Sequence, residues 1–186
     1  MIRIASYNVH GGIGRDRRCS PERIRDVIRE IDPDVIALQE VESSANGIDM
    51  FEWLAAETGL NAIAADVDCG GLRVHVVATH LGLRPAERRF QVERLLKLFT
   101  ATKKDREVLL GDLNEWYLWG RPLRKLRTYF DQAPAPATFP SRHPLFALDR
   151  IYVSPRSMLK ELTVHSSALA RLASDHLPVV ATLDLS

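Results

Sequence analysis

Apolar and polar residues follow one another in a pattern that predicts strands separated by helices. Short apolar runs predict strands at Ile2–Val9, Val35–Leu38, Leu72–Thr79 and Glu107–Leu110. Ser20 and Pro21 resemble an N-cap and a first helical residue, and apolar residues then recur at helical spacing. The apolar face of this expected helix consists of Ile24, Val27, Ile28 and Ile31.

Three more helices are expected. Asp49 with Glu52 resembles a capping box for a helix that ends near Gly59. Another helix begins near Pro85, and Arg121–Phe130 forms a third whose basic side chains we interpret as a solvated face. The inner face of the helix after Pro85 consists of Val92, Leu95, Leu96 and Phe99.

The pattern changes in the last third of the chain. Residues 131–147 are rich in Pro and Ala and are expected to form a long ordered loop. The runs Leu148–Val153, Leu162–Ser166 and Val179–Leu185 follow without intervening helices, which predicts antiparallel strands. Such a mixture indicates an α/β fold with helices packed on sheet faces. Because no linker or repeat divides the chain, we expect residues 1–186 to form one domain.

Composition narrows the class of protein. The 186 residues are 46% hydrophobic and 26% charged, which excludes a disordered or fibrous chain, and a net charge of +1 disfavours a protein that coats nucleic acid. Cys19 and Cys69 lack the spacing of a zinc site. No apolar run approaches the roughly 18 residues of a transmembrane span. We expect a cytoplasmic monomer.

Unusual polar residues stand where the predicted strands end. Asn8, Glu40 and His80 end the first three strands, and Asp112 with Asn114 follows the fourth. Polar groups at strand ends are where α/β folds place binding chemistry. Each residue alone could satisfy a turn or a sheet edge, but five together are difficult to explain by turn chemistry.

Two further polar groups stand at strand beginnings. Asp149 opens one apolar strand, and Asp175 with His176 precedes the last. Because an antiparallel strand begins at the edge where its neighbours end, all eight residues are expected to meet on one rim. Carboxylate and amide oxygens without a thiolate suit Mg²⁺ or Mn²⁺.

A water nucleophile fits this set of residues. The chain has neither a Gly-x-Ser-x-Gly elbow nor a phosphate-binding Gly-x₄-Gly-Lys-Ser/Thr loop. Histidine and spare carboxylates can orient and deprotonate water, while a hard cation neutralises phosphate oxygens. The residues therefore point to phosphoester hydrolysis.

The same residues resemble the signature of the endonuclease/exonuclease/phosphatase superfamily. The matching motifs, in order, are Ser6-Tyr7-Asn8-Val9-His10, Leu38-Gln39-Glu40-Val41, Thr79-His80-Leu81, Gly111-Asp112-Leu113-Asn114, Leu148-Asp149-Arg150-Ile151 and Ser174-Asp175-His176-Leu177-Pro178. This resemblance implies an α+β fold, a four-layer αββα sandwich of two packed mixed sheets flanked by helices, here smaller than usual. It also implies Mg²⁺-dependent (or Mn²⁺-dependent) hydrolysis of a phosphoester by an activated water.

The resemblance also implies roles for the rim residues. Glu40 would be the main metal ligand, supported by Asn8 and Asp175. His176, held in its tautomer by Asp149, would be the general base or a stabiliser of the transition state. Asp112 would orient or deprotonate the water, so the sequence leaves two groups able to take its proton. The phosphate oxygens would be held by Asn114 and His80.

The motif Thr79-His80-Leu81 favours the phosphatase, sphingomyelinase-like and deoxyribonuclease branches over abasic-site repair. We expect a lipid or small-molecule phosphoester substrate, with a nuclease acting on DNA or RNA as the alternative. Trp116 and Trp119 either line an apolar wall beside the site or anchor a loop.

The chain also departs from the family pattern. Between Thr58 and the strand before Thr79 the chain lacks a hairpin that members of the family usually carry. The sequence leaves open whether this member is naturally compact, whether the chain was shortened, or whether residues of this segment are missing from the sequence. This gap motivates a second alternative, a catalytically silent binding module of the same fold. The intact carboxylates argue against it, because buried carboxylates without a cation are unfavourable.

Overall fold

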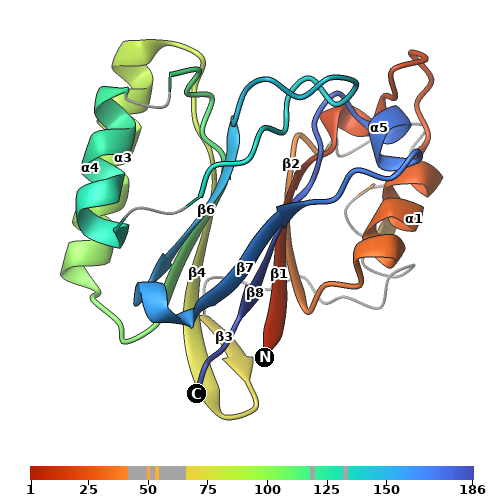
Figure 1. Cartoon of the computed structure of the whole chain (residues 1–186). Helices are drawn as coiled ribbons and strands as arrows, with labels where there is room; N and C mark the ends of the chain where they lie inside the picture. Colours follow the sequence, from red (N-terminus) through yellow and green to blue (C-terminus); the bar gives the residue numbers. More distant parts are fainter. Residues whose placement is uncertain (42–49, 51–52, 55–65, 118–119, 132–133) are drawn as a thin grey trace.

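The computed structural model of the chain describes residues 1–41, 50, 53–54, 66–117, 120–131 and 134–186. Within them, two four-stranded sheets pack face to face between two layers of helices (Figure 1). The expected four-layer αββα sandwich is confirmed. The helix predicted after Asp49 lies outside the described residues for most of its length.

The first sheet has the order β2-β1-β8-β7. Its strands are β1 Ile2–Asn8, β2 Val35–Gln39, β7 Leu159–Val164 and β8 Val179–Leu183. β1 is parallel to β2 and antiparallel to β8, which is antiparallel to β7. The C-terminal ends of β1 and β2 and the start of β8 therefore share one edge.

The second sheet has the order β3-β4-β5-β6. Its strands are β3 Asp66–Cys69, β4 Leu72–His80, β5 Glu107–Asp112 and β6 Asp149–Ser154. β4 and β5 are parallel, and β6 is antiparallel to β5. The register aligns His80 with Asp112 and Asp112 with Asp149, so these three residues form a row across the sheet.

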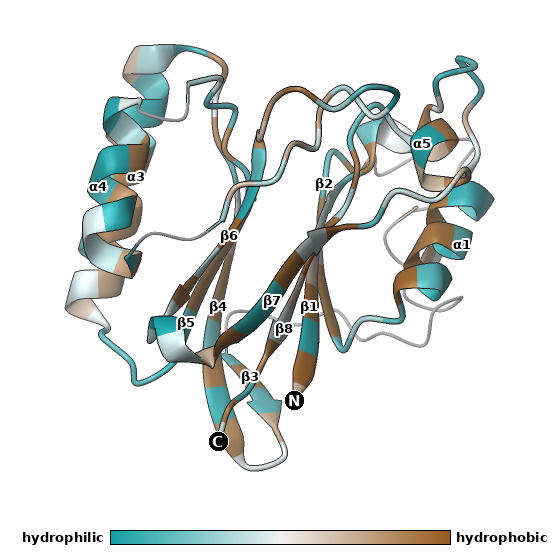
Figure 2. Ribbon diagram, viewed as in Figure 1, coloured by the Kyte–Doolittle hydropathy of each residue, from teal (hydrophilic) through white to brown (hydrophobic). Residues whose placement is uncertain are grey.

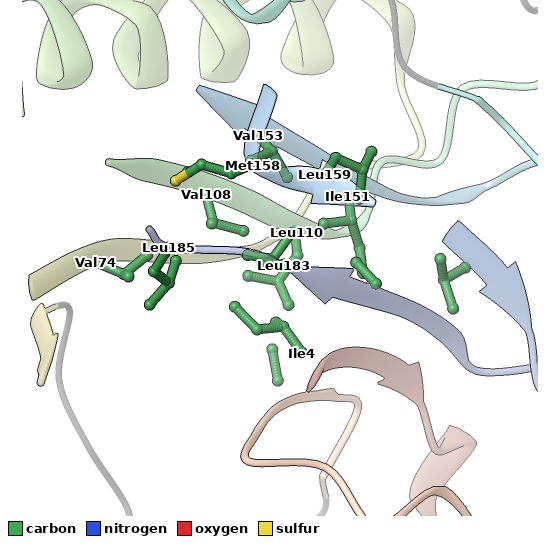
Figure 3. Packing of buried hydrophobic residues seen from close by; sticks show 13 residues of the cluster. Ile4, Val74, Val108, Leu110, Ile151, Val153, Met158, Leu159, Leu183 and Leu185 are labelled. Carbon is green, nitrogen blue, oxygen red and sulfur yellow. The ribbon is translucent and has the colours of Figure 1, made fainter. Parts of the chain in front are cut away.

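Apolar residues hold the four layers together. Between the sheets lies a core to which both contribute, including Ile4, Val108, Leu110, Ile151 and Leu183 (Figure 3). A second core joins the first sheet to α1 (Pro21–Ile31) and α5 (Ala170–Ala173), and a third joins the second sheet to α3 (Pro85–Ala101) and α4 (Arg121–Phe130). Burying this apolar area is the main driving force for the sandwich.

The helices follow the predicted apolar faces. All four residues expected on the inner face of α1 are buried, and the opposite side of this helix is hydrophilic (Figure 2). Ser20 occupies the N-cap position of α1 and Pro21 its first turn, although the Ser20 hydroxyl donates to Glu22 instead of capping a backbone N–H. Tertiary packing therefore fixes the beginning of this helix more than the cap does.

Several elements differ from the sequence prediction. β3 was not expected; it pairs with β4 through a turn at Gly70 and Gly71, both with positive φ, which suits glycine. The strand predicted at Leu162–Ser166 lies earlier, as β7, because a 3₁₀ turn at Arg156–Met158 feeds directly into it. α5 and the 3₁₀ turn η1 (His10–Gly12) are too short to show helical periodicity.

Gly111 allows β5 to lie against β4 where the functional residues begin. Its φ is +144°, and a Cβ at this position would lie 1.8 Å from the carbonyl oxygen of Thr79. Any side chain would therefore push apart the strand ends that carry His80 and Asp112.

Gly111→Ala is expected to lower the free energy of unfolding by about 3 kcal/mol, because it combines backbone strain with a backbone clash. Urea unfolding measures this. Gly70→Ala is the control, since Gly70 has a φ of +66° but no atom within 4 Å of its would-be Cβ. That variant should lose only about 1 kcal/mol. Equal losses in both variants would contradict the clash.

Candidate active site

All eight residues expected on one rim lie at the same end of the sandwich. Asn8, His80 and Asp112 end β1, β4 and β5, while Glu40 follows β2 directly. Asp149 begins β6, and Asp175 and His176 precede β8. This is the end of the sheets opposite the two chain termini in Figure 1. The convergence expected from the strand directions is confirmed.

The side chain of Asn8 connects the two sheets. Its Nδ2 lies 3.0 Å from Glu40 Oε1 in the first sheet and 3.1 Å from Asp112 Oδ2 in the second. Its Oδ1 accepts a hydrogen bond of 3.1 Å from the His10 backbone N–H. Asn8 thus orients two carboxylates, and its expected role as a metal ligand stays a prediction.

His176 and Asp149 form a buried pair. His176 Nδ1 lies 2.8 Å from Asp149 Oδ2, which also accepts a 2.6 Å hydrogen bond from the Thr138 hydroxyl. This arrangement leaves Nε2 of His176 as the nitrogen that faces the rim, 3.9 Å from Asp112 Oδ2. The tautomer expected from the resemblance is consistent with this geometry.

The two buried acid–base groups have displaced pKa values. Burial opposes the charged form of His176, but the hydrogen bond and charge of Asp149, with the charges of Asp112 and Asp175, raise the pKa of His176 to about 9. Burial and the charge of Asp149 raise the pKa of Asp112 above its ordinary value. Without a bound cation, His176 therefore carries a proton at neutral pH.

His80 and Asn114 lie together on the other side of Asp112. Asn114 Nδ2 is 3.1 Å from His80 Nε2 and 2.8 Å from the Leu81 carbonyl oxygen. The Asn114 backbone N–H donates to Asp112 Oδ1 at 2.8 Å. His80 Nε2 is also 3.6 Å from Asp112 Oδ2 and 3.7 Å from Glu40 Oε1. These two residues share one edge of the rim.

Sequence reasoning did not identify two residues that contact this set. His10 Nδ1 lies 3.3 Å from Glu40 Oε2 and 3.9 Å from Asp175 Oδ1. Its signal was present, because His10 ends the motif that carries Asn8. Thr138 is fully buried against Asp149 and lies in a long loop, where no periodicity marks it.

The backbone is strained at three of these positions. His10, Glu40 and Asn114 have φ values of +48°, +57° and +50°, in the left-handed region that residues other than glycine seldom occupy. Such strain persists only where the surrounding structure imposes it, and it concentrates at functional sites. The left-handed conformations of Glu40 and Asn114 turn the chain sharply after β2 and β5.

The donor set fits a hard divalent cation. Glu40, Asp112 and Asp175 present carboxylate oxygens on one rim, and the ion pairs that these groups make are with histidines. The pKa of Glu40 lies below its ordinary value: burial opposes ionisation, but hydrogen bonds from Asn8 and His10 outweigh it. Oxygen ligands of this type are those that Mg²⁺ and Mn²⁺ prefer.

Geometry offers a second set of possible ligands. Ligand atoms of Asp112, Asp149 and His176 lie within 4.8 Å of one another and could hold a metal ion. In this set His176 Nδ1 and Asp149 Oδ2 are hydrogen-bonded to each other, so the ligand atoms that remain are His176 Nε2 and Asp149 Oδ1, which has no hydrogen-bond partner among the described residues. The ligand assignment stays a prediction.

Aromatic rings lie beside His176. The rings of His176 and Phe139 have centroids 4.8 Å apart, and Trp116 packs edge-on against Phe139 at 5.8 Å and Phe146 at 4.8 Å. Trp116 is 42% exposed, so it forms an open wall as well as anchoring the loop. Trp119 lies outside the described residues.

Sequence comparison identifies the family to which this chain belongs. The sequence model of the Endonuclease/Exonuclease/phosphatase family matches residues 5–176, so the chain belongs to that family. Members of this family generally hydrolyse phosphoesters and use a divalent metal ion.

Comparison with individual proteins also finds a relative by sequence. The uncharacterized protein YbhP of Escherichia coli (strain K12) is 33% identical over 122 residues, which are 62% of this chain and 48% of YbhP. The match thus spans about half the length of that relative.

Two solved structures show the shared fold. An endonuclease/exonuclease/phosphatase from Beutenbergia cavernae has a TM-score of 0.71 at 20% identity, covering 100% of this chain and 72% of that one. Sphingomyelinase C from Streptomyces griseocarneus has a TM-score of 0.65 at 17% identity, covering 98% of this chain and 99% of that one.

Among the described residues, no helix is long and apolar enough to span a membrane.

In the presence of chelator, His176 is expected to remain protonated at neutral pH and to lose its proton near pH 9, as followed by the NMR shift of its Cε1 proton. The contribution to stability is then complete below pH 6.5 and is lost as the pH rises through 9. Asp149→Asn should move the midpoint down, because it removes the partner charge. A midpoint near 6.5 in the unmodified protein would contradict this account.

Proposed function

We propose that this protein is a Mg²⁺- or Mn²⁺-dependent phosphoesterase that uses water as its nucleophile. One observation carries the proposal: the Asn8 side chain holds Glu40 of one sheet and Asp112 of the other beside the His176–Asp149 pair. A silent module has no physical need for this convergence, because Asp112 and Asp149 are buried near each other beside Glu40, which is unfavourable without a cation.

Glu40 and Asp175, with Asn8, would hold the cation. When bound, the ion supplies positive charge that neutralises phosphate oxygens in an in-line displacement. His80, which lies beside Glu40, and Asn114 donate hydrogen bonds to the phosphate in this proposal, and together these groups orient the phosphorus atom.

Asp112 and His176 have different roles in the proposed reaction: Asp112 accepts a proton, and His176 donates a hydrogen bond. The raised pKa of Asp112 makes its carboxylate a stronger base, so Asp112 accepts a proton from the water whose oxygen attacks phosphorus. In the proposal His176 keeps its proton when the cation binds, and its Nε2–H donates to a phosphoryl oxygen as negative charge develops there. The P–O bond to the leaving group on the opposite side of phosphorus then breaks, and the departing alkoxide takes a proton from solvent water. Of the two groups that the sequence leaves able to take this proton, the proposal favours Asp112 as the acceptor of the proton from the attacking water.

The substrate proposed is a phosphoester that carries an apolar group. Support comes from the wall of Trp116, Phe139 and Phe146, which begins at the His176 ring and continues to solvent. Aromatic side chains supply large contact areas to apolar and planar groups. The near-neutral net charge agrees with a lipid or small molecule in preference to a nucleic acid.

Hydrolysis of bis(p-nitrophenyl) phosphate in Mg²⁺ or Mn²⁺ is expected, and chelator should stop it. Glu40→Ala and His176→Ala should each lower the rate by about 10²–10⁴-fold. The first removes the proposed main ligand of the cation, and the second removes the proposed hydrogen-bond donor to the phosphoryl oxygen. Circular dichroism checks that both variants fold. Glu161→Gln, an exposed change on β7, is the matched control. Full turnover in either folded variant would contradict the proposed roles.

Trp116→Ala is expected to reduce selectivity for apolar esters. Methyl and phenyl esters of p-nitrophenyl phosphate share one leaving group, so the ratio of their kcat/KM values reports the remaining ester group. The ratio of the phenyl ester to the methyl ester should fall by about tenfold, because the phenyl group loses an apolar contact worth about one to two kcal/mol. Phe90→Ala, an exposed aromatic on α3, should leave the ratio unchanged. A ratio unaffected by Trp116→Ala would place the substrate elsewhere.

A further inference from the structure

Two charged side chains are buried together behind the edge of the rim that holds His80 and Asn114. Arg88, in the first turns of α3, is 4% exposed, and Glu115, which directly follows Asn114, is 5% exposed. Arg88 Nε lies 3.4 Å from Glu115 Oε2. The pair thus links α3 to the loop that carries one of the two expected phosphate ligands.

Arg88 also fastens the segment that follows His80. Its Nη1 donates to the carbonyl oxygens of Gly82 at 3.2 Å and Leu83 at 2.5 Å. One turn further along α3, Gln91 accepts a hydrogen bond of 2.8 Å from the Gly82 backbone N–H. A single guanidinium therefore contacts the loops after both β4 and β5.

Glu115 is fixed on its other side. Its Oε1 accepts a hydrogen bond of 3.3 Å from the Tyr117 backbone N–H. Gly120 packs so closely that a Cβ there would lie 2.5 Å from the Glu115 carboxyl carbon. The carboxylate is therefore held in place on two sides, and Asn114, with its left-handed backbone, is positioned beside it.

Stability alone does not explain this pair. Buried ion pairs commonly stabilise a fold no better than apolar residues of the same size. The surroundings also have an excess of positive charge: Arg150, 4% exposed, is close enough to interact electrostatically with Glu115, and its Nε and Nη2 have no hydrogen-bond partner among the described residues. Buried charges arranged in this unfavourable way are expected to persist where they hold the neighbouring loops in a fixed position.

We propose that Arg88 and Glu115 are positioning residues that set the separation of His80 and Asn114 and so determine how tightly the site holds phosphate. The inference rests on the proposed function, since it assigns both ligands to the phosphate. Neither Arg88 nor Glu115 contacts the substrate; both act through the loops that they join.

Arg88→Met tests this, because it preserves the length of the side chain and leaves Arg150 near Glu115. We expect inorganic phosphate to bind about tenfold more weakly in Mg²⁺, and the KM for bis(p-nitrophenyl) phosphate to rise by a similar factor with a smaller change in kcat. The Cε1 proton signal of His80 should shift, while that of His176 stays in place. Arg88→Lys keeps the charge but not the fork of donors, and it should recover part of the affinity.

The matched control is Lys125→Met, which breaks the exposed 2.6 Å Lys125–Glu93 ion pair between α4 and the same helix α3. It should change none of these values. Unchanged phosphate affinity, KM and His80 signal in folded Arg88→Met would overturn the proposal, and if that variant does not fold, the same readouts in Arg88→Lys decide. Should the unmodified protein neither hydrolyse the diester nor bind phosphate, the proposed function fails, and the His80 signal alone tests the positioning.

Discussion

The site depends on one interaction between the two sheets, the donation by Asn8 to carboxylates on both of them. Glu40 follows a strand of the first sheet and Asp112 ends a strand of the second, so packing the sheets places their charges near each other. The Asn8 amide offsets part of this repulsion, and the Asn114 backbone N–H adds a further donor to Asp112. The histidines beside these carboxylates, His10 near Glu40 and His176 near Asp112, offset a further part of this repulsion.

The same constraint explains the chemistry proposed here. Burial, together with the charge of Asp149, raises the pKa of Asp112, whereas the pKa of His176 is raised against the effect of burial by the carboxylates around it. Asp149 is hydrogen-bonded to His176 and to Thr138, and Thr138 lies in the loop that also carries Phe139 and Phe146 of the aromatic wall. A divalent cation would be the natural counterion of Glu40 and Asp175. In the proposed function, metal binding, proton transfer and substrate contact therefore all depend on the side chains gathered on this rim.

Most of the fold and site could be predicted from the sequence, because strong local signals coincide with tertiary roles. Asn8, Glu40, His80 and Asp112 stand at the ends of apolar runs, so strand direction alone brings them to one rim. β3 could not be predicted, since Asp66–Cys69 is short, polar and largely exposed, and only pairing with β4 defines it. Thr138 and the Arg88–Glu115 pair were also missed, because their roles arise from contacts distant in sequence that no local pattern reports.

The most direct test of the central claim is to locate Mn²⁺ by anomalous diffraction from crystals of the protein grown with the ion. The account predicts a single strong peak on the rim with a Glu40 oxygen about 2.1–2.3 Å away and oxygens of Asp175 or Asp112 nearby. A peak bounded by Asp149 and His176 instead of Glu40, or no peak at saturating Mn²⁺, would contradict it.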